Sequence, residues 1–273
     1  MNINYRKLIS KAFKLPQVVR HKVYQAFPSF LGFEINNNLL QLYRNDDVFR
    51  TAFSFNHFIE FYSQLPDLEM LVSIRAYDRL GKLLGKKSFS IYKKGATQFF
   101  LNDLFSNLDE YGLFSVALKL RPSYVKSLFY LGAIAPQFMT LFVPLNENYS
   151  SQMVHSHKHQ QGHLWLPRNH VRHSGHVEIL KDVRRIHIFV LNSCRSEIKF
   201  KVQILDTQTN GLVIERTASI RGYSTVCLEF SRNDFQNSVE GLLFKYFYNR
   251  SVDHKKPIIF RQFTNENWSG NHT

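Results

Sequence analysis

Seven of the twelve histidines of this 273-residue chain lie between residues 146 and 176. Three of them, His155, His157 and His159, alternate along the chain, so on a β-strand their side chains project from one face. Imidazoles spaced in that way stand roughly 6–7 Å apart, given a rise of ~3.3 Å per residue. Two or three of them can share one zinc or iron ion. A further ligand could be His163, or His272 if the two halves of the chain pack tail to tail.

Two other interpretations of the histidine-rich stretch stay open. A polar connector between domains has the same composition, because histidine tracts bind metals only loosely. A surface that responds to protonation is the other interpretation, since histidine titrates near pH 6.5. Seven histidines together would add positive charge on mild acidification, and an acidic partner would then bind more tightly as the pH falls.

The opening of this stretch, NENYS at 146–150, returns near the C-terminus as NENWS at 265–269. Each copy sets polar amides beside an aromatic ring, Tyr149 or Trp268, an arrangement that can stack a sugar ring and hydrogen-bond its hydroxyls. The alternative is a hairpin, in which the Asn residues turn the chain and the aromatic ring returns to the core. The candidate ligand-binding residues are therefore Tyr149, His155, His157, His159, Trp268 and His272.

Hydrolytic motifs are absent from the sequence: it contains no GxSxG, HExxH or P-loop pattern. The acidic residues with repeated positions lie in expected turns, where short side chains cap the backbone; they are Asp103, Asp109, Glu110, Asp234 and Glu240. We assign no catalytic residue. An enzyme that uses a metal on His155, His157 and His159 is the less favoured alternative.

The formal net charge is +14, which favours an anionic glycan, an acidic protein or an anionic membrane surface as partner. Nucleic acid is less favoured, because no RRM, KH or zinc-finger signature accompanies the basic residues. The two cysteines, Cys194 and Cys227, have no metal-type spacing and indicate a reducing, cytoplasmic location. The sequence contains no run of about 18 apolar residues, so we predict no transmembrane helix.

The N-terminal segment, residues 1–30, contains no acidic residue, because the first in the chain is Glu34. Its apolar residues favour one helical face, which predicts a basic amphipathic helical segment. Such a helix either packs on the following domain or lies on the inner face of an anionic membrane.

Strand signals dominate the rest of the chain. Residues 71–77 alternate apolar and polar side chains, and an Asp-Arg-Leu-Gly turn at 78–81 follows. The same order of strands and turns recurs from residue 198 onward with an offset of 127–131 residues. We therefore expect an all-β fold of two tandem antiparallel β-sandwich repeats, at 31–160 and 177–273, joined by a histidine-rich connector at 161–176.

Together these features predict a non-catalytic binding protein for an anionic or carbohydrate-bearing partner, such as an accessory protein in surface-glycan metabolism. A metal-dependent enzyme and a membrane-surface adaptor are the alternatives. The directions in which the histidine side chains point would help to distinguish the binding protein from these alternatives.

Overall fold

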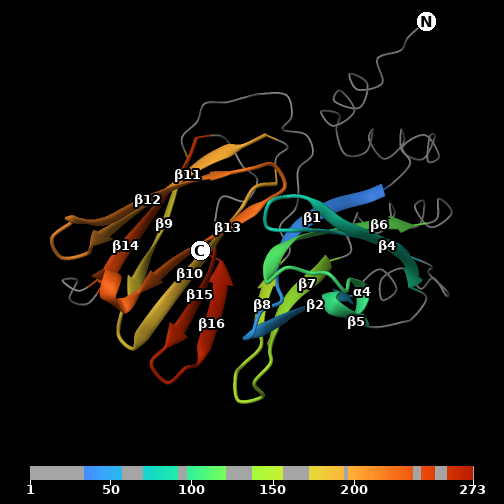
Figure 1. The fold of residues 1–273 in the computed structure, drawn as a ribbon, viewed down its shortest axis with the longest axis horizontal. Helices are drawn as coiled ribbons and strands as arrows, with labels where there is room; N and C mark the ends of the chain where they lie inside the picture. The colour runs from blue at the N-terminus through green and yellow to red at the C-terminus, as the bar shows by residue number, and fades with distance from the viewer. Residues whose placement is uncertain are drawn as a thin grey trace, which may run out of the picture.

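The computed structural model describes residues 34–56, 70–91, 97–120, 137–155, 172–193, 196–235, 241–249 and 257–272. Within these ranges the chain is almost entirely β, with sixteen strands in four antiparallel sheets (Figure 1). None of the helices in these ranges has the length and hydropathy needed to cross a bilayer. The expected basic helix at 1–30 lies outside the described residues. Most of the expected connector at 161–176 also lies outside the described residues. Because β9 begins at Arg172, the last five residues of that connector belong to a strand.

The first half contains two sheets. One has the strand order β1-β6-β3-β4 and the other β5-β2-β7-β8. A single helical turn, α4 (Leu101–Leu104), separates β5 from β6. The strand bounds are β1 (Glu34–Arg44), β2 (Phe49–Asn56), β3 (Met70–Tyr77), β4 (Leu83–Ile91), β5 (Thr97–Phe100), β6 (Tyr111–Leu120), β7 (Gln137–Pro144) and β8 (Gln152–His155).

The second half repeats this strand order. Its sheets run β9-β14-β11-β12 and β13-β10-β15-β16, so every strand number is that of the first half raised by eight. A 3-10 turn, η2 (Arg232–Phe235), takes the place of α4. The strand bounds are β9 (Arg172–Ile179), β10 (Val183–Leu191), β11 (Ile198–Asp206), β12 (Leu212–Ile220), β13 (Thr225–Ser231), β14 (Gly241–Tyr248), β15 (Ile258–Phe263) and β16 (Trp268–His272).

Two corresponding turns are built by corresponding aspartates. The carboxylate of Asp78 accepts hydrogen bonds from the backbone N–H groups of Leu80 and Lys82 at 2.9 and 2.8 Å. The carboxylate of Asp206 accepts two from Gln208 and Thr209, each at 2.8 Å. These side-chain bonds replace water at the exposed backbone of each hairpin.

Alternating burial places the core between the two sheets of each half. On β11 the apolar residues Ile198, Phe200, Val202 and Ile204 are buried while the intervening side chains face outward. They pack against Ile186, Ile188 and Ile259 of the opposite sheet. Such period-2 burial is what a half-exposed antiparallel strand dictates. The result is a β-sandwich-like packing of two sheets.

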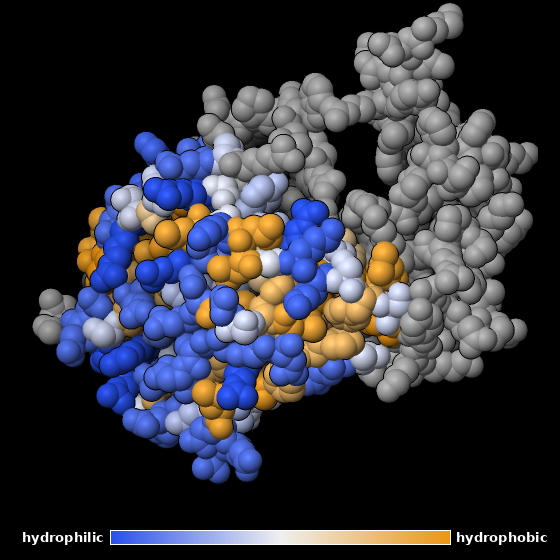
Figure 2. All heavy atoms as spheres, turned by 45° about the vertical axis from the view of Figure 1, so that its right-hand side comes forward, coloured by the Kyte–Doolittle hydropathy of each residue, from blue (hydrophilic) through white to orange (hydrophobic). Residues whose placement is uncertain are grey.

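A third apolar cluster joins the halves. Leu42 and Leu113 of the first half pack with Phe189 and Phe260 of the second. Because Ile188 on the same strand points the other way, the sheet β13-β10-β15-β16 buries apolar residues on both faces. The three clusters therefore follow one another through the molecule. Figure 2 shows hydrophilic and hydrophobic side chains interspersed over the outer face that it draws.

Candidate functional site

Both copies of the repeated Asn-Glu-Asn sequence are hairpin turns. In the β7–β8 turn the Asn146 side chain accepts a hydrogen bond from the N–H of Asn148 at 3.0 Å. In the β15–β16 turn Asn265 accepts one from the N–H of Asn267 at 3.1 Å. The amides that were candidates for binding sugar hydroxyls therefore stabilise the turns, as expected when Asn caps its own backbone two residues on.

The aromatic residue of each copy points toward the cluster between the halves. Trp268 is 7% exposed, with its ring 5.9 Å from that of Phe49 in an edge-on contact. The Arg44 guanidinium lies 5.3 Å from the same ring. Tyr149 is half-buried against the same cluster. The Trp268 ring thus packs in the protein interior, and its faces are not open to a sugar.

The last strands of the two halves, β8 and β16, lie side by side (Figure 1). Gln152 joins them: its amide donates to the carbonyl of Trp268 at 3.2 Å and accepts from the N–H of Gly270 at 2.9 Å. His155 ends β8 and His272 ends β16. The structure therefore brings together the strands that carry these two candidates.

The predicted metal site itself lies outside the described residues. His157 and His159 fall in the range 156–171, and the side chains of His155 and His272 are likewise not described. The zinc or iron hypothesis on these histidines stays a prediction.

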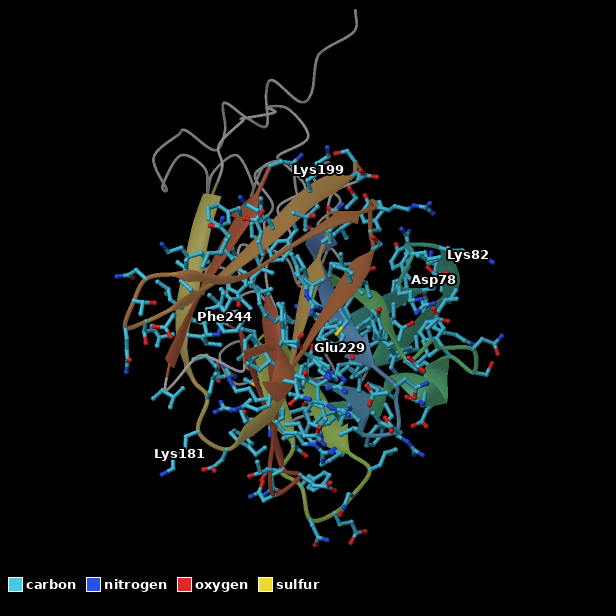
Figure 3. All side chains as sticks on the ribbon, turned by 60° about the vertical axis from the view of Figure 1, so that its left-hand side comes forward. Asp78, Lys82, Lys181, Lys199, Glu229 and Phe244 are labelled. Carbon is cyan, nitrogen blue, oxygen red and sulfur yellow. The ribbon has the colours of Figure 1, made fainter. Side chains whose placement is uncertain are left out.

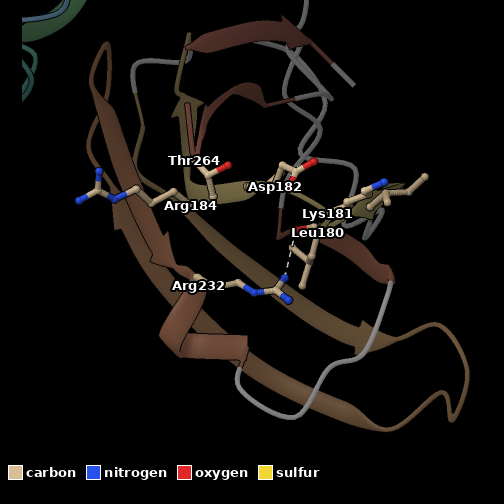
Figure 4. A pocket seen from close by; sticks show the side chains of 8 residues that line it. Leu180, Lys181, Asp182, Arg184, Arg232 and Thr264 are labelled. Atoms are coloured by element: carbon tan, nitrogen blue, oxygen red, sulfur yellow. Dashed lines mark hydrogen bonds between the residues drawn. The ribbon is translucent and has the colours of Figure 1, made fainter. Parts of the chain in front are cut away.

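A basic hollow of about 830 Å³ lies at the turn between β9 and β10. Its charged lining residues are three basic ones, Lys181, Arg184 and Arg232, and one acidic one, Asp182. In Figure 4, Arg232 reaches beneath Leu180, while Lys181 and Arg184 extend to either side. The excess of cationic donors can hold an anionic group.

Backbone contacts fix the shape of this hollow. Asp182 adopts a φ of 62°, in the left-handed region that short polar side chains tolerate. Its carbonyl accepts a hydrogen bond from the N–H of Thr264 at 2.8 Å. Arg232 donates to the carbonyl of Leu180 at 3.1 Å, and Arg184 pairs with Glu266 at 3.1 Å. Arg232 of η2 is therefore joined to the turn that carries Lys181.

Sequence reasoning did not identify this hollow. Lys181, Arg184 and Arg232 lie in no local sequence motif. They converge because η2 packs beside the β9–β10 turn. The only signal in the sequence was the excess of positive charge, and net charge does not show where on the surface a basic site lies.

A polar chain crosses the interior of the second half. The Tyr246 hydroxyl lies 3.1 Å from Nδ1 of His176, whose Nε2 lies 3.2 Å from a carboxylate oxygen of Glu178. Arg261 completes the chain by donating to both oxygens of Glu178. Burial alone would raise the pKa of Glu178, but hydrogen bonds from His176 and Arg261 outweigh it and lower that pKa. Burial raises the pKa of Tyr246.

The first half has a simpler polar contact between the corresponding strands. Thr140 on β7 lies 3.4 Å from the amide oxygen of Gln41 on β1, and both residues are buried. The second half thus replaces a neutral pair by a charged network. Because every member of that network has a partner and the network is enclosed, its chemistry is that of an internal clamp rather than of an exposed active site.

A buried arginine lies between the halves. Arg44 is 3% exposed and its Nε donates to Asp46 at 2.6 Å. Its guanidinium also lies 4.6 Å from the ring centroids of both Phe49 and Phe260. The aromatic faces and the carboxylate together offset the cost of burying the charge.

No protein-family model matches the sequence, and no curated protein matches it. Among solved structures, the chain is similar to a β-glucuronidase from glycoside hydrolase family 2, at 10% identity and TM-score 0.17, over 85% of this chain and 23% of that one. It is also similar to β-glucuronidase 2 of Bacteroides uniformis, at 8% identity and TM-score 0.17, over 89% and 27%. It is similar to vicilin from hazelnut, Corylus avellana, at 11% identity and TM-score 0.14, over 82% of this chain and 76% of that one. The chain spans about a quarter of the length of the two glucuronidases, and TM-scores at this level carry no argument about function.

Proposed function

We propose that this chain is a non-catalytic binding protein of two tandem β-sandwich repeats, and that it binds an anionic, carbohydrate-bearing partner at the β9–β10 turn. The observation that carries the proposal is the basic hollow lined by Lys181, Arg184 and Arg232. The net charge of +14 adds long-range attraction for the same class of partner.

The tandem repeat is part of the proposal. The strand order of the first half recurs in the second, and the carboxylates of Asp78 and Asp206 each accept a hydrogen bond from the backbone N–H two residues on. A gene segment copied once accounts for both observations.

An acidic saccharide fits the hollow chemically. Its carboxylate or sulfate group can pair with Lys181 and Arg232, since guanidinium and ammonium groups form charge-assisted hydrogen bonds with oxyanions. Ile179, which is 69% exposed, offers an apolar surface for the C–H face of a sugar ring. We place the protein in the cytoplasm or at the inner face of a membrane, as an accessory protein in surface-glycan metabolism.

The test compares binding of a uronic-acid polysaccharide with that of a neutral dextran of the same size. We expect binding of the acidic polymer alone, and a loss of about tenfold in affinity in Lys181→Glu, because a charge reversal at one desolvated contact costs about 1.4 kcal/mol or more. Lys199→Glu is the matched control, since Lys199 lies on another edge of the molecule (Figure 3).

Equal loss in the two variants would show that only net charge matters and would remove the hollow as the site. Anionic lipid vesicles and single-stranded DNA belong in the same titration. Preferential binding to vesicles would favour a membrane-surface adaptor, and preferential binding to DNA would favour a nucleic-acid partner. Either result would contradict the saccharide proposal.

A further inference from the structure

Three potential metal ligands meet on the sheet that faces the first half. His187 lies on β10, and Cys227 and Glu229 lie on β13. His187 is directly opposite Glu229 in the antiparallel register, and Cys227 is opposite Phe189. Residues two apart on a strand share a face, so the three side chains project to one side. Their ligand atoms all lie within 4.8 Å of one another.

An independent feature points to a missing partner at this place. Nε2 of His187 is buried and has no hydrogen-bond partner within the described part of the chain. Buried polar groups are almost always paired, so each exception needs a physical explanation. Burial and the nearby Arg44 charge lower the pKa of His187. A metal ion is one partner that this unpaired ring nitrogen can accept.

From this geometry we propose that His187, Cys227 and Glu229 bind one zinc ion. Zinc takes Cys sulfur at ~2.3 Å and His nitrogen or carboxylate oxygen at ~2.0–2.2 Å in a tetrahedral array. Ligand atoms in such an array stand roughly 3.3–3.8 Å apart, so small side-chain rotations close the present spacing. Three protein ligands leave a fourth position for water.

The surroundings suit a divalent cation. Binding displaces the proton of the Cys227 thiol to solvent, and the thiolate and the Glu229 carboxylate then balance the two positive charges of the ion. The neighbouring Arg44 charge is already paired with Asp46 at 2.6 Å. Glu229 is exposed while His187 and Cys227 are half-buried, so the ion can enter from the Glu229 side.

The site is distinct from the histidine-rich stretch, and the experiment must separate the two. We start from full-length protein carrying His155→Ala, His157→Ala and His159→Ala together with Trp165→Phe. Trp268 is then the single tryptophan, and its ring lies 5.2 Å from that of His187. Cobalt(II) chloride serves as the probe, because it replaces zinc, quenches nearby indole fluorescence and shows sulfur-to-cobalt charge-transfer absorption when a thiolate binds.

We expect one equivalent of cobalt to quench Trp268 and to produce the charge-transfer band, and zinc to displace it. Cys227→Ser should abolish the band, and His187→Gln should weaken binding by about 100-fold or more. Glu229→Gln changes an exposed residue and should weaken binding about tenfold or more without affecting folding, since outer groups alone change metal affinity by about 10–100-fold. Glu215→Gln, an exposed acid on β12, is the matched control and should bind as the parent does.

Absence of the band, or a band that survives in Cys227→Ser, would overturn the proposal. So would an unchanged affinity in Glu229→Gln. Saccharide binding at the β9–β10 turn is measured separately, and its outcome does not bear on the metal site.

Discussion

Arg261 on β15 donates to both carboxylate oxygens of Glu178 on β9 and so joins the two sheets of the second half. Their side chains are 12% and 6% exposed. His176 holds one of the same oxygens at 3.2 Å. A charge in such an enclosed place is tolerated because each of its oxygens is paired.

Removal of one partner should therefore be costly. We expect Glu178→Ala to lower the free energy of unfolding by about 3–5 kcal/mol, because an unpaired buried guanidinium remains. Denaturant titration measures the change. Glu266→Ala removes the exposed partner of Arg184 and should change stability by about 1 kcal/mol or less. Comparable losses of unfolding free energy in the two variants would contradict a stabilising role for the buried pair of Glu178 and Arg261.

The same carboxylate should make stability depend on pH. Burial favours the neutral acid, but the hydrogen bonds from His176 and Arg261 prevail and hold the folded pKa of Glu178 below its ordinary value of 4.5. Its contribution is thus fully present above pH 4.5 and is lost as the pH falls through the lower folded pKa. We expect Glu178→Gln to lose less stability than the parent on acidification over this window, measured by denaturant midpoints. Parallel pH curves would exclude this carboxylate as a determinant.

Trp268 should contribute to stability rather than to sugar binding. Its ring is 7% exposed and lies between Phe49 and His187. Trp268→Ala should cost about 3–5 kcal/mol, the range for large aromatic truncations in a core, while the affinity of the folded variant for the acidic polysaccharide stays unchanged. A selective loss of that affinity without loss of stability would reinstate the ring as a ligand platform.

Gly81 of the Asp78 turn is expected to be more sensitive to substitution than Gly211 of the Asp206 turn. Its φ is +88°, and an added Cβ would collide with the carbonyl oxygen of Gly222 in the second half. Gly81→Ala should therefore destabilise the protein by about 1–3 kcal/mol. The control is Gly211→Ala, where the nearest atom to an added Cβ is the Thr209 hydroxyl at 3.1 Å and no positive φ is required. Thermal unfolding of both variants gives the comparison, and equal effects would contradict this account.

Local sequence patterns were sufficient to predict some of the strands and turns. The alternation at 71–77 and 198–204 corresponds to β3 and β11, and the aspartate turns that follow them form the hairpins. The repeated Asn-Glu-Asn turns were predicted with two alternatives, and the backbone favours the hairpin. These features are local because periodicity and turn hydrogen bonds involve residues only a few positions apart.

Only the tertiary structure decided which of these strands meet and what lies between them. No sequence motif links His187 with Cys227 or Glu229. The three residues lie close together because of the register of β10 with β13. Lys181 and Arg232, like Glu178 and Arg261, also converge from distant segments. The physical reason is that sheet pairing and packing depend on the summed burial of many apolar side chains. The sequence alone determined that strands form, and the packing of sheets determined which polar groups were enclosed together.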